Sequence, residues 1–599
     1  MLSSRSLSRP LTRASLARSY ATSPPPPPAR RSAYDLALLG LGGAGLTGFL
    51  LWKGKGQQQE MPVSKDGERT SFTVPVVEQT GGASTKTLTL LTHAETNQRL
   101  KENEASFAVS RRNNPLIRYD TNNLASNSPI EDDSCCVILE RDASSNVKGD
   151  LTFFGVFDGH SGWQTSRLLA SSLVSYVARE LDLVFRGSDP YASLLPGSSP
   201  SSSSSKSLSF WSLFKQSPPP PQPQLDLHDD IVQQAVKNAF SRMDGDIVNA
   251  PIRLLEKLQK EGNLPNMSGS NGLGVEQSEA LSALLPALSG SCALMAFLDA
   301  GRNKLHVACT GDSRAVMGVW VPDGKGGGKW RVEALSEDQE GNNPNEVKRI
   351  QSEHPPNEAA TVITRGRILG GLQPTRAFGD SRYKWPPGVQ QQLAAAFHPG
   401  SVRGPPRNYH TPPYVTATPE VITVDLSADR PKSRKSIGSF LPVSSPEEPL
   451  ATRFVVLATD GLYDRLDNQE VVSLVGAHLC GVRSPQNRSA VLSHSIDPNA
   501  AKPSTSPHAP RQAPTRGEGE CYTFEDGNLS THLIRNALGG AKRDQVSVLL
   551  SIPAPLSRRY RDDITCTVLL LGDPARDGEG GSGGVYRRDE PFEPLKAKL

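Results

Sequence analysis

Four aspartates stand at the rims of short apolar segments that are otherwise typical of buried β-strands. FFGVFDGH contains Asp158, VACTGDSR contains Asp312, VVLATDGL contains Asp460, and Asp562 stands just before ITCTVLLL. A carboxylate at the rim of a buried strand is costly unless a cation or hydrogen-bond donors pair with it. Asp158 and Asp460 are each followed by glycine, which lets the backbone approach an ion closely. The set therefore predicts one shared cation site.

The chemistry of these side chains favours magnesium or manganese. Hard carboxylate oxygens without histidine or cysteine suit Mg²⁺ or Mn²⁺ better than zinc or copper. The seven cysteines include no CxxC pair, which argues against a zinc ribbon, a disulfide framework and a thioredoxin-like site. For any single aspartate of this kind, a turn or a helix N-cap is the better interpretation. The combination of four is what favours a metal site.

Short apolar strands and longer helical patterns alternate around these aspartates. The segments expected to be buried strands are TFFGVFD, CALMAFLD, KLHVACTG, RFVVLATD and ITCTVLLL. Apolar residues at helical spacing predict helices over Trp163–Val184 and Ile231–Val248. Helices among many strands indicate an α+β domain, whose strand ends would position the four aspartates.

Eight segments, in this order along the chain, resemble the type 2C family of metal-dependent protein phosphatases. They are SPIEDD, FGVFDGHSG, GSCALMAFLD, VACTGDSRAV, LSEDQ, GGLQPTRAFGD, VVLATDGLYD and RDDITCTVLLL, within about residues 100 to 572. Each segment alone is a weak signal, and the ordered set is specific. The resemblance implies a central β-sandwich of two mainly antiparallel sheets flanked by helix pairs. It also implies a protein serine/threonine phosphatase.

The resemblance assigns ligands to two Mg²⁺ or Mn²⁺ ions. Asp158 would bridge both ions. Asp460 and Asp562 would complete the protein ligands of one ion, and Glu131 with the carbonyl of Gly159 would serve the other.

It also assigns a third metal position and a catalytic histidine. Asp312, with Asp460 and Asp464, matches the family's weaker third metal position. His160 matches the residue that protonates the leaving alkoxide. The expected chemistry is in-line attack on phosphorus by a water that the ions activate, without a phosphoenzyme.

A narrower resemblance points to the mitochondrial pyruvate dehydrogenase phosphatase branch and its fungal relatives. Its segments are RYDTNNLASNSPIEDD, EVKRIQSEHP, LQPTRAFGDSRYKWP, YHTPPYVTATPEV and SRRYRDDIT. It implies pyruvate dehydrogenase as a phosphoprotein substrate. Many type 2C enzymes have a phosphate-binding arginine where this chain and that branch have asparagine, here Asn127, so the phosphate-anchoring residues stay unassigned. Gln339 stands where an SxDH pattern would place histidine.

Two other interpretations compete with an active metal-dependent enzyme. Cys309 and Arg314 in CTGDSR resemble the phosphate loop of cysteine-based phosphatases, but the spacing is one residue short. The second alternative is a catalytically dead, membrane-tethered relative that serves as a binding protein. Degenerate homologues usually lose metal ligands, whereas the principal ligands named above are all present, which favours the enzyme.

Both ends of the chain carry targeting patterns. Residues 1–33 are rich in Arg and Ser and lack acids, as in a mitochondrial transit peptide. Residues 34–53 contain an uncharged apolar run, a candidate transmembrane anchor that would leave the domain in either the intermembrane space or the matrix. The tail 574–599 ends in Ala597-Lys598-Leu599, which resembles a peroxisomal signal. We therefore expect mitochondrial and peroxisomal import machinery as partners.

Composition divides the remainder of the chain. Residues 54–92 read as a linker and 93–573 as the catalytic domain. Ser/Pro-rich stretches near 187–224, 427–450 and 484–516 cannot bury enough apolar surface to fold, so we expect disordered insertions.

The charge of the chain is unevenly distributed. Six arginines precede the first acid, Asp35, and subtracting them from the formal net charge of +3 leaves −3. A near-neutral body does not indicate a nucleic-acid partner.

Overall fold

The computed structural model describes much of the chain between residues 70 and 572. The described residues are 70–77, 83–109, 111, 114–140, 149–185, 228–262, 275–323, 325, 327–397, 404–427, 452–498 and 521–572. The predicted transit peptide, membrane anchor and C-terminal tail lie outside them, as do the insertion at 187–224 and nearly all of that at 427–450. Within the described ranges, no helix has the length and apolarity needed to cross a membrane.

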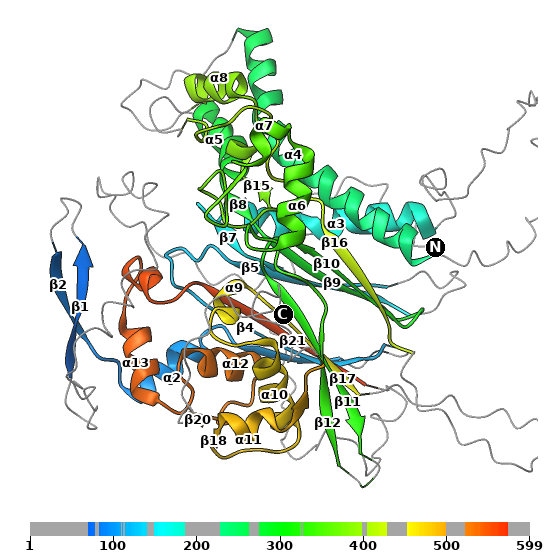
Figure 1. Ribbon diagram of the computed structural model, residues 1–599, viewed down its shortest axis with the longest axis vertical. Helices are drawn as coiled ribbons and strands as arrows, with labels where there is room; N and C mark the ends of the chain where they lie inside the picture. The colour runs from blue at the N-terminus through cyan, green and yellow to red at the C-terminus, as the bar shows by residue number, and fades with distance from the viewer. Residues whose placement is uncertain are drawn as a thin grey trace, which may run out of the picture.

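Two large sheets form the centre of the molecule (Figure 1). In order, the antiparallel five-stranded sheet contains β16 (Glu420–Asp425), β10 (Lys304–Thr310), β9 (Ala293–Asp299), β6 (Leu151–Phe157) and β5 (Asp133–Leu139). The seven-stranded sheet contains β19 (Ser495–Ile496), β12 (Gly328–Ala334), β11 (Arg314–Pro322), β17 (Arg453–Ala458), β21 (Ile564–Leu571), β4 (Leu116–Leu124) and β3 (Ala105–Ala108). Within it, β19 runs parallel to β12 and the other neighbouring strands are antiparallel.

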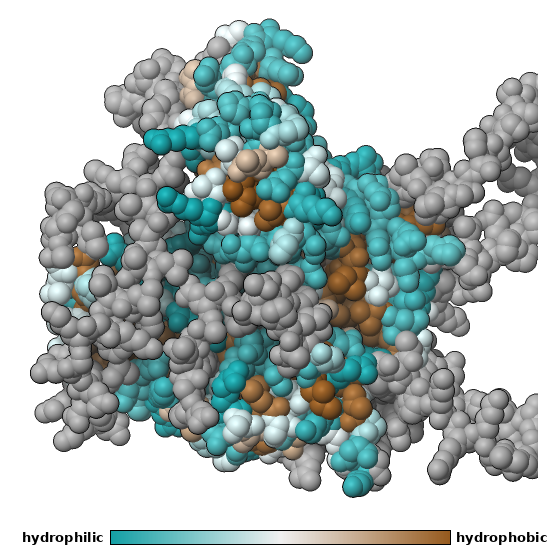
Figure 2. Space-filling model, viewed as in Figure 1, coloured by the Kyte–Doolittle hydropathy of each residue, from teal (hydrophilic) through white to brown (hydrophobic). Residues whose placement is uncertain are grey.

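The central strands are apolar along their whole length because both of their faces are buried. In β9, Met295 and Phe297 belong to the core under the helices, whereas Leu294 and Ala296 belong to the core between the sheets. Alternation of successive side chains explains this division, and burying each large side chain stabilises the fold by about 1.5–3 kcal/mol. On the face seen in Figure 2 the described side chains are mostly hydrophilic, in keeping with an apolar interior.

Helices cover the outer face of each sheet (Figure 1). The five-stranded sheet is covered by α3 (Gln164–Phe185), α4 (Asp229–Glu261) and α5 (Val275–Leu288), with α8 (Pro387–Phe397) packed on α4 and α5. The seven-stranded sheet is covered by α10 (Asn468–Leu479) and α12 (Leu529–Leu538), with α2 (His93–Lys101) and α13 (Arg543–Ser551) beside them. The predicted α+β sandwich is therefore confirmed, as are its five buried strands and both helices.

Smaller elements complete the described fold. A three-stranded sheet joins β15 (Phe378–Gly379), β8 (Gly290–Ser291) and β7 (Gly159–His160). The segment between β12 and β15 contains α6 (Pro344–Glu353), α7 (Pro356–Ala359), β13 (Ile363–Thr364) and β14 (Arg367–Ile368). The short helices η3 (Ser381–Tyr383), α9 (Asp460–Tyr463) and η4 (Leu556–Arg559) lie near strand ends.

Two predicted unstructured segments are partly folded. Within the predicted linker 54–92, β1 (Ser71–Val77) pairs with β2 (Ala83–Thr89), because their Thr- and Val-rich sequences suit extended chain. Within the predicted insertion 484–516, β18 (Gln486–Asn487) pairs with β20 (Cys521–Tyr522), and α11 (Arg488–Leu492) follows β18. The Asn487 side chain caps α11 and Val491 is fully buried, so the disorder prediction was wrong up to residue 498.

Candidate metal centre and active site

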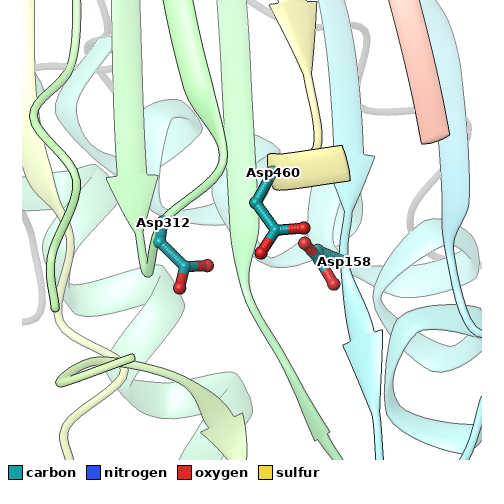
Figure 3. Close-up of side chains that lie close together, drawn as sticks. All are labelled: Asp158, Asp312 and Asp460. Carbon is teal, nitrogen blue, oxygen red and sulfur yellow. The ribbon is translucent and has the colours of Figure 1, made fainter. Parts of the chain in front are cut away.

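Three carboxylates from separate strand ends meet at one edge of the sandwich. Asp158 follows β6, Asp312 lies in the turn between β10 and β11, and Asp460 begins α9 directly after β17. One oxygen from each carboxylate lies within 4.8 Å of the other two. Figure 3 shows Asp158 and Asp460 directed toward one another, with Asp312 beside them. Since β6 and β10 belong to one sheet and β17 to the other, both sheets build the site.

The electrostatics of this cluster fit a divalent cation. Burial raises the pKa of Asp158 well above its usual range, and so do the negative charges of Asp460, Asp132 and Asp312. Burial and the charge of Asp460 likewise raise the pKa of Asp562 to about 7. Carboxylates held this close repel one another, and Mg²⁺ or Mn²⁺ would remove that repulsion with the oxygen ligands these ions prefer.

The other two predicted acidic ligands, Glu131 and Asp562, lie beside the three-carboxylate group. Both contact the guanidinium of Arg558. Nη1 of Arg558 lies 2.8 Å from Oε2 of Glu131 and 3.6 Å from Oδ1 of Asp562. Glu131 also accepts hydrogen bonds from the Gly162 amide at 2.7 Å and from Asn127 Nδ2 at 3.1 Å. Asp562 acts electrostatically on Asp158 and Asp460, so it borders the same centre.

Gly159, the predicted carbonyl ligand, lies against the backbone of Glu131. A Cβ atom on Gly159 would come within 2.1 Å of the Glu131 carbonyl oxygen. The Ser166 hydroxyl donates a hydrogen bond to that same carbonyl. Glycine is therefore needed for this close approach, which brings the backbones of two residues predicted to serve one ion side by side.

His160 forms an ion pair with a residue that the sequence did not single out. Its Nε2 lies 2.6 Å from Oδ2 of Asp380. The small sheet β7–β8–β15 creates this contact, because His160 pairs with Gly290 in β8 and Asp380 directly follows β15. Burial alone would lower the pKa of His160, but the charge and hydrogen bond of Asp380, together with the charges of Asp312 and Glu131, raise it. The protonated imidazole, which can act as an acid, is thereby favoured.

Two further acids support the centre from behind. Asp563 accepts hydrogen bonds from the backbone amides of Asn127 at 3.0 Å and Glu131 at 2.9 Å. Asp132 accepts one from the Thr459 hydroxyl at 2.9 Å, next to Asp460. Each directly follows a predicted ligand, since Asp132 follows Glu131 and Asp563 follows Asp562. Neighbouring residues in extended chain face opposite sides. The sequence could therefore have indicated that one acid of each pair faces the centre and the other faces inward.

Gln339 fixes the turn that carries Asp312. Its Oε1 accepts a hydrogen bond from the Gly311 amide at 2.8 Å, and its Nε2 donates to the Cys309 carbonyl at 3.1 Å. Gln339, which stands where the SxDH pattern has histidine, therefore holds the turn of Asp312 in place through its side-chain amide.

The cysteine-based alternative does not fit the structure. Cys309 is buried between the sheets, and burial raises the pKa of its thiol well above the usual range. Nε and Nη2 of Arg314 bind the Asp338 carboxylate at 2.9 and 2.5 Å, and Nη1 binds Asn468. The thiol is thus neither ionised nor near a guanidinium open to phosphate, as such a mechanism requires.

Comparisons with known proteins show the family to which the chain belongs. The pattern of the protein phosphatase 2C family matches residues 232–432 and 445–501. The mitochondrial [pyruvate dehydrogenase [acetyl-transferring]]-phosphatase 1 of Saccharomyces cerevisiae is 34% identical over 504 residues, covering 81% of this chain and 73% of that protein. The chain belongs to the protein phosphatase 2C family.

Other relatives place it in one branch of the 2C phosphatases. A protein phosphatase 2C homologue of Schizosaccharomyces pombe is 34% identical, covering 80% of this chain and 84% of that protein. The human mitochondrial pyruvate dehydrogenase phosphatase 1 is 32% identical, covering 81% and 84%. This 2C phosphatase is accordingly a metal-dependent protein serine/threonine phosphatase of the pyruvate dehydrogenase phosphatase branch, and it is assigned to mitochondria.

Proposed function

We propose that this phosphatase removes phosphate from phosphoserine or phosphothreonine of pyruvate dehydrogenase, using two divalent cations. The proposal of this substrate is supported by the pyruvate dehydrogenase phosphatases among the relatives of the chain. The proposal of the chemistry is supported by the carboxylates of the site. The carrying observation is the set of carboxylate oxygens of Asp158, Asp312 and Asp460 within 4.8 Å of one another.

Five acids and one carbonyl would hold the cations. Asp158 lies centrally, because the charges of Asp460, Asp312 and Asp562 all act on its carboxylate. The backbones of Gly159 and Glu131 lie against one another beside it. When bound, the cations supply a water of lowered pKa for attack on phosphorus and offset charge on the phosphoryl oxygens.

His160 would supply the proton for the leaving alkoxide. A serine or threonine alkoxide is a poor leaving group, so protonation in the transition state lowers the barrier. Asp380 favours the protonated form of the imidazole and orients the ring through their contact of 2.6 Å. Asp380 is a positioning residue in this scheme.

The metal-dependent chemistry has a direct test. The purified chain should hydrolyse a phosphoserine peptide in Mn²⁺ or Mg²⁺, lose that activity in a chelator, and regain it when metal returns. Asp158→Asn should abolish the activity. An active, metal-independent Asp158→Asn protein would refute the scheme, and a wild-type protein inactive with either metal would favour the dead-homologue alternative.

The substrate has a separate test. Phosphorylated pyruvate dehydrogenase should be hydrolysed with a kcat/KM well above that of an unrelated phosphoprotein at equal concentration. Equal rates on both proteins would contradict the substrate proposal and leave the phosphatase chemistry standing.

Compartment decides whether that substrate is within reach. A tag near Ser201 leaves both ends free, and protease treatment of intact mitochondria, mitoplasts and peroxisomes then locates the domain. Protection in mitoplasts supports a matrix enzyme acting on pyruvate dehydrogenase. Digestion in mitoplasts indicates an anchored domain in the intermembrane space, and protection in peroxisomes indicates use of the C-terminal signal.

A further inference from the structure

Arg558 stands at the margin of the carboxylate centre, and most of its guanidinium donors have no partner among the described residues. Its side chain is 41% exposed, and Nη1 alone makes its contacts, with Glu131 and Asp562. Among the described residues, Nε and Nη2 make no hydrogen bond. These two nitrogens form the edge of the guanidinium that binds two oxygens of one phosphate at once.

Short contacts fix the backbone that carries Arg558. The Ser557 hydroxyl donates to the Ser126 carbonyl at 2.5 Å, which ties η4 to the loop containing Asn127 and Glu131. On the other side, Nη2 of Arg465 donates to the Tyr560 carbonyl at 2.6 Å. Contacts with two separate segments therefore hold the backbone on both sides of Arg558.

Arg558 reaches the same atom as Asn127. Oε2 of Glu131 accepts from Asn127 Nδ2 at 3.1 Å and from Arg558 Nη1 at 2.8 Å. The asparagine amide is neutral and already binds Asp563 as well, at 3.0 Å. Of these two side chains, Arg558 is thus the one that brings a positive charge and open donors to this side of the centre.

We propose that Arg558 binds the phosphoryl group of the substrate, through Nε and Nη2, while Nη1 stays on Glu131. The inference rests on the proposed phosphatase reaction and names a phosphate-anchoring residue for it. A phosphate dianion beside several carboxylates would be repelled without nearby positive charge, and an arginine fork offsets that charge with directed hydrogen bonds.

Four variants test this assignment. Arg558→Ala removes the fork, Arg558→Gln keeps most of the stem, and Arg558→Lys keeps a charge without the fork. Arg559→Ala is the matched control: this next residue is exposed, and its side chain makes no hydrogen bond or ion pair to the described residues. The measurements are KM and kcat for p-nitrophenyl phosphate, the inhibition constant of inorganic phosphate, and the half-saturating Mn²⁺ concentration.

Loss of the fork should raise KM and the phosphate inhibition constant by about 10-fold or more, the effect of losing a hydrogen bond to a charged group. Arg558→Lys should lie between wild type and Arg558→Ala, and Arg559→Ala should match wild type. If Arg558→Ala does not fold, Arg558→Gln carries the same expectation.

Two results would overturn the proposal. One is an unchanged phosphate inhibition constant in both Arg558→Ala and Arg558→Gln. The other is a rise in half-saturating Mn²⁺ with unchanged phosphate binding, which would show that Arg558 only positions Glu131. An inactive wild-type enzyme would instead refute the phosphatase scheme, so the two failures are distinguishable.

A double variant adds a gain-of-function arm. Because Asn127 and Arg558 contact the same Glu131 oxygen, Asn127→Arg should restore phosphate binding to Arg558→Ala. A lower phosphate inhibition constant in the double variant than in Arg558→Ala supports the proposal. No recovery, with wild-type-like thermal stability, counts against a shared phosphate position.

Discussion

Nε2 of His160 lies 2.6 Å from Oδ2 of Asp380, although 220 positions separate the two residues along the chain. Three strands of two residues each bring them together, with Gly290 of β8 between them. The pair places a carboxylate behind the imidazole, which stabilises the protonated ring and fixes its orientation.

Replacing Asp380 should therefore affect substrates according to their leaving groups. Asp380→Asn should lower kcat on a phosphoserine peptide by about 10-fold or more, because its alkoxide needs a general acid. It should lower kcat on p-nitrophenyl phosphate much less, since that leaving group is stable without protonation. Steady-state kinetics on both substrates, with His160→Gln for comparison, give the answer. Equal losses on the two substrates would show that Asp380 serves the fold instead.

The carboxylate centre should make Asp158→Asn more stable than wild type when no metal is present. Asp158 is buried among negative charges, so neutralising it relieves repulsion and should raise Tm by about 2–4 °C. With saturating Mn²⁺ the order should reverse, because the wild type binds the ion and gains stability by mass action. Thermal melts in chelator and in Mn²⁺ measure both.

A matched control for that experiment is Asp323→Asn in the hairpin between β11 and β12. Asp323 is exposed and lies at the opposite end of β11 from Asp312. Its Tm should respond to Mn²⁺ as the wild type does. A Tm for Asp158→Asn that rises with Mn²⁺ as much as the wild type would contradict the metal assignment.

Gly290→Ala should disrupt the His160–Asp380 pair through space. The added Cβ would lie 2.1 Å from His160 Nε2 and 2.3 Å from Asp380 Oδ2, so the pair must separate. We expect a loss of about 1–3 kcal/mol in stability, and a kcat loss that again falls mainly on the peptide substrate. Gly388→Ala is the control, because nothing lies within 4 Å of its added Cβ. Full peptide activity in Gly290→Ala would argue against this geometry.

Stability at low pH should depend on Glu346. Burial alone would raise the pKa of Glu346, but Arg376 and Arg349, each 2.7 Å from its carboxylate, outweigh it and lower the pKa to about 2. Because the folded-state pKa is depressed, this stabilisation is complete above about pH 4.5 and is lost as the pH falls toward 2. A shift from about 4.5 to about 2 corresponds to about 3 kcal/mol.

The Tm difference between wild type and Glu346→Gln measures that contribution. It should be large and constant from pH 7 down to about 5 and then shrink as the pH falls further. A difference that stays constant through the acid range would show that the loss comes from packing alone.

The core and the three central aspartates could be predicted from the sequence because their signals are local. A strand buried on both faces reads as a continuous apolar run, and an acid at its end is conspicuous. That reasoning located β6, β10 and β17 together with Asp158, Asp312 and Asp460.

The partners of the site could not be predicted in this way because their contacts are non-local. Arg558 and Glu131 are 427 positions apart, and Asp380 meets His160 across 220 positions. Nothing in the residues around Arg558 or Asp380 reveals these partners. The predictions of a linker up to residue 92 and of a disordered insertion from 484 were partly wrong for a different reason. They rested on composition, which does not reveal the pairing of β1 with β2 or the Asn487 cap of α11.

Strand β21 lies between β17 and β4 in the seven-stranded sheet, and Asp562 stands immediately before it. Because β4 and β17 precede β21 along the chain, both are made before the strand that lies between them in the sheet. The sheet can close, and Asp562 can join the other acids, only after nearly the whole chain has been made. A chain that stops before β21 would therefore lack both a central strand of the sheet and one of the proposed metal ligands.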